Sequence, residues 1–349
     1  MIFASDNWAG AHPKVSAALA RHAEGFAAAY GSSTLDRAIE ARFNEIFERE
    51  VAVFFVGTGT AANSLALASV NRPGGVTFCH REAHVIEDEC GAPEFFTHGA
   101  RLVPVDGPDG RVDPATLTSE IRRFPPGFVH HGQPMAITIT QATEIGTVYS
   151  GAQIDEIAAI AKHYQLPLHM DGARFANALV HLGMTPAEMT WKRGIDVVSF
   201  GATKNGCWCA EALVFLNPAD AADLPFIRKR AAQLFSKSRF IAAQFEAYFE
   251  DDLWLDLARH ANATAGRLQA GLTGASRARI GWQSQTNEVF AILGKEDAEA
   301  ARGKGAIFYD WNAPRSVSGT IGEDETLVRL VTSFATGEDD VDRFIELFQ

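Results

Sequence analysis

The residue best suited to covalent chemistry is a lysine in a short, glycine-flanked segment. Lys204 lies in Ser199-Phe-Gly-Ala-Thr-Lys-Asn-Gly206, directly after an apolar run typical of a strand. A second such run, Leu166 to Met170, ends in Asp171-Gly-Ala-Arg174. The sequence therefore places an amine and a carboxylate at the ends of two strands, where ligands gather in parallel α/β sheets.

An amine and a carboxylate in this arrangement match the requirements of pyridoxal 5'-phosphate. A lysine amine holds this cofactor as a Schiff base, and a carboxylate opposite the pyridine nitrogen keeps the nitrogen protonated and the ring an electron sink. Lys204 and Asp171 predict such a site together. Singly, a lysine near a strand end is usually a solvated charge, and Asp-Gly is usually a turn.

A phosphate-binding loop is predicted where the first strong strand gives way to a helix. The segment is Val56-Gly57-Thr58-Gly59-Thr60-Ala61-Ala62-Asn63. Small residues let the backbone approach a ligand, and the free N–H groups and positive dipole end of a helix attract phosphate. The segment lacks the full dinucleotide fingerprint and a Walker lysine, so a plain strand-to-helix turn is the alternative.

Four more side chains are candidates for the site. An imidazole at His84 has an aromatic face and a titratable nitrogen, although a structural histidine explains it equally well. Arg174 follows Asp171, and Arg329 lies in an otherwise apolar strand, where a charge is costly unless it is partnered. Both match the planar geometry of a carboxylate. Arg239 is a weaker candidate, because a solvated helix face explains its basic surroundings.

Length and composition describe an ordinary folded protein. The chain has 349 residues, 47% apolar and 21% charged, which favours one large and one smaller domain. The net charge of −12 disfavours binding to nucleic acid or anionic membranes. The four cysteines lack paired zinc spacing and are interpreted as reduced thiols, with no metal site. No signal region or apolar span is evident, so we expect a cytoplasmic protein.

Alternating apolar runs and helical patterns predict an α/β fold with a mainly parallel sheet covered on both faces. A long helical stretch that includes Ile227 to Phe249 could connect two domains. The predicted division is a large domain over residues 1–240 and a small C-terminal α+β domain over residues 241–349. The seven predicted strands of the large domain are Val51–Val56, Val76–Cys79, Arg101–Val105, Met135–Gln141, Leu166–Met170, Val197–Phe200 and Ala212–Leu216. The small domain is expected to hold a helix at Leu253–Leu272, strands at Arg279–Trp282, Val289–Leu293, Ala306–Trp311 and Leu327–Phe334, and a helix at Asp339–Phe348.

Several motifs in order resemble the low-specificity L-threonine aldolases, which depend on pyridoxal phosphate and share the fold type I of the aspartate-aminotransferase-like superfamily. The resemblance runs the whole length of the chain. It rests on Ser5-Asp6-Asn7, Gly59-Thr60-Ala61-Ala62-Asn63, Ala83-His84, Asp88-Glu89-Cys90-Gly91-Ala92-Pro93-Glu94, His169-Met-Asp-Gly-Ala-Arg174, Gly201-Ala-Thr-Lys-Asn-Gly206 and Val328-Arg-Leu-Val331.

This resemblance implies a role for each candidate residue. Lys204 would hold the cofactor, Asp171 would pair with the pyridine nitrogen, and His84 would stack on the ring. Gly59 and Thr60 would bind phosphate. The resemblance further implies substrate or cofactor anchors at Ser5, Arg174 and Arg329, with Arg329 on the amino-acid carboxylate, and a phosphate contact from Arg239 of an adjacent subunit in a homotetramer whose active sites lie at dimer interfaces.

One departure concerns the substrate hydroxyl. Many members of the family carry a second active-site histidine after the strand that ends at Gln141, whereas this chain reads Gln141-Ala-Thr-Glu144 and places Thr143 near that position. With weak control from that side, we expect both L-threonine and L-allo-threonine to be cleaved. The sequence leaves open whether His84, or a water molecule that it orients, is the base.

The resemblance implies retro-aldol cleavage of L-3-hydroxy-α-amino acids to glycine and an aldehyde, a lyase reaction of amino-acid metabolism. Two alternatives stay open. A β-eliminating lyase or an aminotransferase would use the same electron sink on another bond and would release keto acids. A catalytically silent protein of the same fold would have no need to retain Lys204, Asp171, His84 and Arg329 together.

Overall fold

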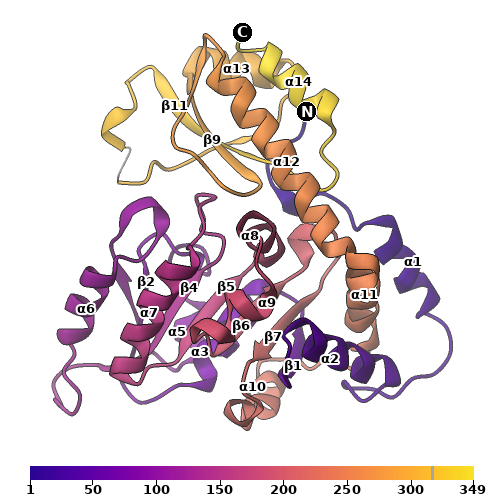
Figure 1. The fold of residues 1–349 in the computed structure, drawn as a ribbon, viewed down its shortest axis with the longest axis vertical. Coiled ribbons are helices and arrows are strands. Elements are labelled where there is room, and N and C mark those ends of the chain that lie inside the picture. The colour runs from indigo at the N-terminus through magenta and orange to yellow at the C-terminus, as the bar shows by residue number, and fades with distance from the viewer. Residues whose placement is uncertain (316–317) are drawn as a thin grey trace.

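A seven-stranded sheet forms the centre of the larger part of the molecule (Figure 1). The computed structural model describes residues 1–315 and 318–349. The strand order is β1-β7-β6-β5-β4-β2-β3, and β7 alone runs against the others. The strands are β1 (Ala52–Val56), β2 (Gly75–His80), β3 (Arg101–Val105), β4 (Gln133–Thr140), β5 (Leu168–Gly172), β6 (Val197–Gly201) and β7 (Glu211–Phe215).

Helices cover both faces of this sheet, which explains why its central strands are buried throughout. One face packs on α1 (Pro13–Arg21), α2 (Thr34–Ile46), α6 (Pro114–Arg122), α7 (Gly151–Tyr164), α8 (Phe175–Leu182), α9 (Pro186–Met189) and α11 (Arg239–Phe249). The other face packs on α3 (Gly59–Ser69), α4 (His84–Glu87), α5 (Ala92–Phe96) and α10 (Leu224–Arg230). All seven predicted strands and the α/β architecture with a mainly parallel sheet are confirmed.

The long helix expected across residues 227–249 is wrong, because the chain leaves the helix after Arg230 and resumes it at Arg239. Ala232 has a left-handed backbone with φ 60°. Next to it, the Gln233 side chain accepts a hydrogen bond from the N–H of Gly57 at 3.1 Å. These tertiary contacts with the loop after β1 override the local helix propensity.

A second, antiparallel sheet of order β10-β11-β9-β8 forms the smaller part. Its strands are β8 (Ala278–Ile280), β9 (Glu288–Gly294), β10 (Tyr309–Asp310) and β11 (Glu325–Val331), and its helices are α13 (Lys295–Gly303) and α14 (Glu338–Glu346). The strand expected over 306–311 is therefore only two residues long. The start of the chain joins this sheet, because the N–H of Phe3 donates to Ile307 and the N–H of Val331 donates to Phe3, each at 2.8 Å.

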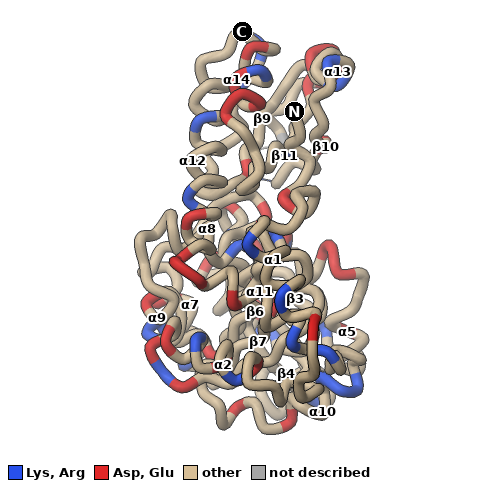
Figure 2. Tube along the Cα trace, turned by 90° about the vertical axis from the view of Figure 1, so that its right-hand side faces the viewer, with Lys and Arg blue, Asp and Glu red and all other residues tan. Residues whose placement is uncertain are grey.

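Helix α12 (Leu253–Thr273) runs from one core into the other. Its first half buries Trp254 and Ala258 in the core of the large sheet, and its second half buries Leu268 and Leu272 in the core of the small sheet. The boundary at residues 240 and 241 stays a prediction. In the turned view, the small part stands above the large one and both carry charges of both signs (Figure 2). Within the described ranges, no helix has the length and apolarity needed to cross a membrane.

Candidate active site

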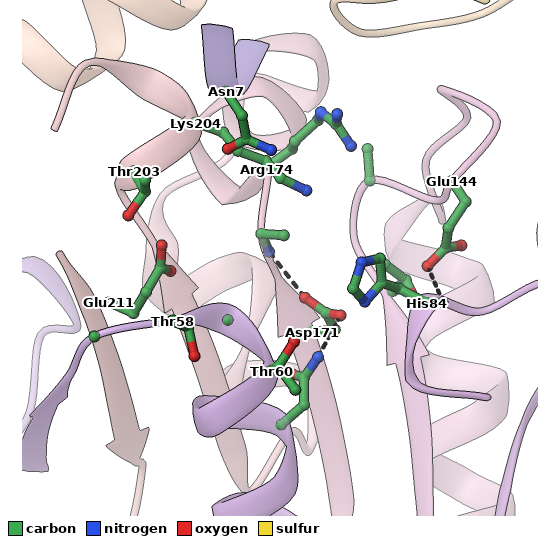
Figure 3. Close-up of a pocket in the computed structure, with 16 residues that line it drawn as sticks. Asn7, Thr58, Thr60, His84, Glu144, Asp171, Arg174, Thr203, Lys204 and Glu211 are labelled. Atoms are coloured by element: carbon green, nitrogen blue, oxygen red, sulfur yellow. Dashed lines mark hydrogen bonds between the residues drawn. The ribbon is translucent and has the colours of Figure 1, made fainter. Parts of the chain in front are cut away.

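A cavity of about 260 Å³ opens where β1, β2, β4, β5 and β6 end (Figure 3). It adjoins a second cavity of about 280 Å³ that contains Ser5 and Arg329, and the two share Asn7, His84, Glu144, Arg174 and Lys204. The first cavity is lined by Asn7, Gly57, Thr58, Gly59, Thr60, Asn63, His84, Thr140, Ala142, Glu144, Asp171, Ala173, Arg174, Thr203, Lys204 and Glu211. Its place at the carboxyl ends of parallel strands is where open α/β sheets bind ligands.

Lys204 lies on a single helical turn, Thr203–Asn205, after β6. The next side chain anchors this turn, because Asn205 Nδ2 donates to the hydroxyl of Tyr248 and to the carbonyl of Trp254, both at 2.8 Å. Gly206 then reverses the chain with φ 106°, a conformation that favours glycine. The lysine is thus presented to the cavity by a fixed turn.

Asp171 lies in β5 with its side chain buried. One carboxylate oxygen accepts a hydrogen bond from Asn63 Nδ2 at 2.8 Å, and the other accepts one from the N–H of Ala173 at 3.0 Å. His169 of the same strand bonds to Thr138 and Ser199 at 2.7 and 2.9 Å, and burial lowers its pKa to about 4. The acid is therefore held at the cavity by donors rather than by an arginine or lysine.

A hydrogen-bonded chain connects His84 with Asp171. The amide of Asn63 donates both to Asp171 and to Glu89 Oε1, at 2.8 and 2.7 Å. The same oxygen of Glu89 is 2.9 Å from Nδ1 of His84. This bond to Glu89 raises the pKa of His84, while burial works against the charge. Burial raises the pKa of Glu89 itself. The ring of His84 is thereby fixed at the cavity wall.

The glycine-rich loop forms one end of the cavity. Thr58 caps α3 by accepting the N–H of Ala61 at 3.1 Å, and a methyl group on Gly59 would meet no atom within 4 Å beyond its chain neighbours and the backbone of its own helix. Thr203 donates from its N–H and its hydroxyl to Glu211, whose pKa burial raises to about 7. Apart from Lys204 and Arg174, no lysine or arginine in the described part of the chain lines this cavity.

Buried ion pairs form the opposite end. Arg174 donates to both carboxylate oxygens of Asp6, at 2.8 and 3.2 Å, and lies 3.3 Å from Glu288. Burial opposes its charge, but Asp6 and Glu288 outweigh burial and raise its pKa. Arg329 lies 3.7 Å from Glu288 and 4.1 Å over the ring of Trp311. Its Nε has no hydrogen-bond partner within the described structure, so this end retains donors for an anion.

Two expectations need comment. Arg239 does not line either cavity within this chain, and its Nη1 lies 3.3 Å from the carbonyl of Gly25. Thr143, expected near the position of the second histidine, lines neither cavity, because its side chain is fully buried and its hydroxyl lies 2.7 Å from that of Thr147. The next residue, Glu144, faces the cavity instead.

The cavity fits pyridoxal phosphate on its own geometry. A free amine and a buried carboxylate line one space. The open space at Gly59 and the N-terminus of the eleven-residue α3 suit a phosphate group. The sequence missed Asp6, Asn63, Glu89, Glu144 and Glu288 as parts of the site, although four of them lie within or beside the quoted motifs.

The comparisons with known proteins agree with this architecture. The fold is that of fold type I enzymes, as a match to a serine palmitoyltransferase of Sphingomonas wittichii illustrates, with a TM-score of 0.72 at 15% identity over 100% of this chain and 86% of that chain. The model of the beta-eliminating lyase family matches residues 3–295, and the chain belongs to this family.

Two proteins with higher sequence identity to this chain are threonine aldolases. A low specificity L-threonine aldolase of a Pseudomonas species is 41% identical over 307 residues, which cover 88% of both chains. The solved structure of a threonine aldolase from Leishmania major has a TM-score of 0.91 at 30% identity and covers 99% of this chain and 98% of that chain. The resemblance inferred from the sequence motifs is thereby confirmed.

Proposed function

We propose that this protein is a pyridoxal-phosphate-dependent lyase that cleaves L-threonine, L-allo-threonine and related L-3-hydroxy-α-amino acids to glycine and an aldehyde. The observation that carries the proposal is the sharing of Lys204 by two adjoining cavities, one with Asp171 and one with Arg329. The threonine aldolases that are 41% identical to the chain support this substrate class.

The cofactor end is assigned from the contacts described above. Lys204 would bind the cofactor covalently, Asp171 would face the pyridine nitrogen, and His84 would lie against the ring. Gly59 and Thr60, at the N-terminus of α3, would hold the phosphate. When bound, pyridoxal phosphate supplies an electron sink for the pair released as the Cα–Cβ bond breaks.

The substrate end is assigned to the ion-pair cluster. Arg329 and Arg174 would bind the substrate carboxylate, with Ser5 beside them in the same cavity. The two guanidinium groups would orient the amino acid because each matches the planar, two-oxygen geometry of a carboxylate. Lys204 lines both cavities and would hold or move a proton at Cα.

We further infer a cytoplasmic homotetramer with active sites at dimer interfaces, and no nucleic-acid or membrane partner. The glycine-rich end supports this inference, since it contains the acid Glu211 and needs additional positive charge for a phosphate. Arg239 of a second copy would supply that charge. Arg239→Ala would then weaken cofactor binding without changing substrate affinity, which fluorescence titration of the apoprotein with cofactor measures.

Product analysis tests the activity. The purified protein, loaded with cofactor, is incubated with L-threonine, L-allo-threonine and phenylserine, and glycine and aldehyde are measured. Equal amounts of glycine and aldehyde are expected. Keto acid and ammonia would point to β-elimination, and a yellow protein that turns over none of these substrates would point to a silent member of the fold.

A further inference from the structure

The carboxyl group of Glu144 stands where three cavities meet. It lines the cavity that contains Asp171, the cavity that contains Arg329, and a third one of about 310 Å³ between α4 and Trp311. Its Oε1 accepts a hydrogen bond from the backbone N–H of His84 at 2.7 Å, which fixes its position. Figure 3 shows Glu144 beside His84, across the cavity from Thr58 and Thr203.

The histidine at this wall is poorly suited to accept a proton. Nδ1 of His84 is 2.9 Å from Glu89 Oε1, and the Glu89 side chain is fully buried. This bond favours the charged ring and raises the pKa of His84. Nδ1 is thereby engaged by Glu89 and is not free to accept a proton from a substrate. The geometry therefore favours a neighbouring group as the base for the substrate hydroxyl.

Other carboxyl groups around the cavity have different surroundings. Asp171 is bound by the donors of Asn63 and Ala173. Glu211 is bound by Thr203 at the glycine-rich end. Asp88 is exposed. It lines the cavity that contains Arg329 and the one between α4 and Trp311, but not the cavity that contains Asp171. Among the acidic residues in the described part of the chain, Glu144 is the one that lies beside His84 and lines both the cavity with Asp171 and the cavity with Arg329.

The surroundings of Glu144 also give its carboxyl group a pKa that suits proton transfer. Its pKa is raised to about 7, mainly by burial; the charge of Asp171 contributes in the same direction, and the N–H and ring of His84 oppose the shift. A carboxyl group with a pKa near the working pH both takes up and gives back a proton readily. The charged or titratable groups that line the cavities around it are Glu82, His84, Glu87, Asp88, Asp171, Arg174, Lys204, Glu211, Asp310 and Arg329.

We propose that Glu144 is the general base for the β-hydroxyl group in the cleavage, an inference that rests on the proposed function. The proton passes from the hydroxyl oxygen to a carboxylate oxygen of Glu144, and the O–H electron pair becomes the second bond of the new carbonyl. The Cα–Cβ bond breaks, and its electron pair would be stabilised by the electron sink that pyridoxal phosphate supplies when bound. One proton is later delivered to Cα, so glycine and aldehyde account for every atom of the substrate.

The test separates the hydroxyl proton from the rest of the reaction. Glu144→Gln keeps the shape of the side chain and an oxygen for the N–H of His84 but removes the base. We expect cleavage of L-threonine to fall about 10²- to 10⁴-fold, the usual contribution of a general base. Exchange of the α-proton of glycine with D₂O, followed by NMR, involves no hydroxyl and is expected to stay unchanged. Glu156→Gln, at an exposed carboxylate on α7, is the matched control with both rates unchanged.

The pH profile supplies an independent readout. Since the base acts only when ionised, kcat/KM for threonine should rise with pH through about 7 in the unmodified protein. This limb should vanish in Glu144→Gln and persist, at a lower rate, in Glu144→Asp, which also serves if the glutamine variant does not fold. Normal cleavage by Glu144→Gln, or an equal loss of cleavage and glycine exchange, overturns the assignment. An unmodified protein that forms no glycine from threonine overturns the proposed function itself.

Discussion

The two ends of the active-site cavity are built in different ways. The cofactor end is made by loops that follow neighbouring strands of one sheet, and hydrogen bonds from Asn63 and from the backbone N–H of Ala173 hold the carboxylate of Asp171. The carboxylate end, where Arg174 and Arg329 would bind the carboxylate of the substrate, joins segments that are far apart in the chain. Buried charges such as Asp6 and Arg174 hold it together. The cofactor end is therefore formed within the large sheet alone, whereas the carboxylate end also connects the small sheet to the large one. Substitutions should affect chemistry at the first end, and both binding and stability at the second.

The largest effect is expected from removing the amine at the cofactor end. Lys204→Ala should lower turnover at least about 10³-fold, because loss of a covalent catalytic residue acts on this scale. The measurement is glycine formation over many turnovers, together with the absorption of the bound cofactor before and after borohydride treatment. Lys204→Arg is the control that keeps the charge without the reactive amine. Substantial turnover by the alanine variant would remove Lys204 from its role.

The acid of the same end comes next. Asp171→Asn retains hydrogen bonding to its surroundings but lacks the negative charge, so turnover should fall about 10²- to 10³-fold, as for loss of one electrostatic stabiliser. Cofactor affinity should change much less. The measurement is kcat of the variant at saturating cofactor. A near-normal kcat would show that the charge of Asp171 is not needed.

At the carboxylate end, the expected cost is one of stability. Asp6→Asn leaves the buried guanidinium of Arg174 without its closest anion, and breaking a buried pair in this way costs about 3 kcal/mol. Urea unfolding monitored by circular dichroism gives this number. Asp342→Asn breaks an exposed pair with Arg267 and should change stability by less than about 1 kcal/mol. Equal effects of the two substitutions would contradict the distinction between the ends.

A smaller effect is expected at Arg329. Arg329→Lys keeps the charge but loses the two-pronged geometry, so the KM for threonine should rise about tenfold, or about 1.4 kcal/mol, with little change in kcat. Titration with substrate and, separately, with cofactor distinguishes the two ligands. If cofactor affinity falls while the KM stays constant, Arg329 belongs to the phosphate and not to the substrate.

The smallest effect is a shift of one titration. Glu89→Gln replaces the carboxylate that raises the pKa of His84 by a neutral amide, so the ring should lose its proton at lower pH than in the unmodified protein. The stabilisation that the charged ring contributes is present below the ordinary pKa of histidine and is lost as pH rises through the raised value. NMR titration of the histidine rings measures the shift. Identical titration of His84 in both proteins would disprove the coupling.

The sequence predicted the sheet well because apolar runs bounded by small residues are a local signal. Lys204 and Asp171 were predicted to lie together for the same reason, since each follows or ends such a run, and both line one cavity. Glu144 was missed because nothing local tells which side chain of a loop after a strand faces inward, and Thr143 was chosen instead. The bond from Asn63 to Glu89 and Asp171 depends on three elements packing together. No periodicity in the sequence predicts such a contact.

The attachment of the first residues to the small sheet has a consequence for the order in which the protein matures. The chain is synthesised from its N-terminus, and domains generally fold in that order. The loops of the cofactor end, residues 57–211, are all present before Asn287, which bonds to Asp6 across 281 positions, and before Arg329. Phe3 and Asp6 must therefore wait for the last part of the chain to emerge. A growing chain can assemble its cofactor cradle first, and it gains the means to hold an amino acid only near the end of translation.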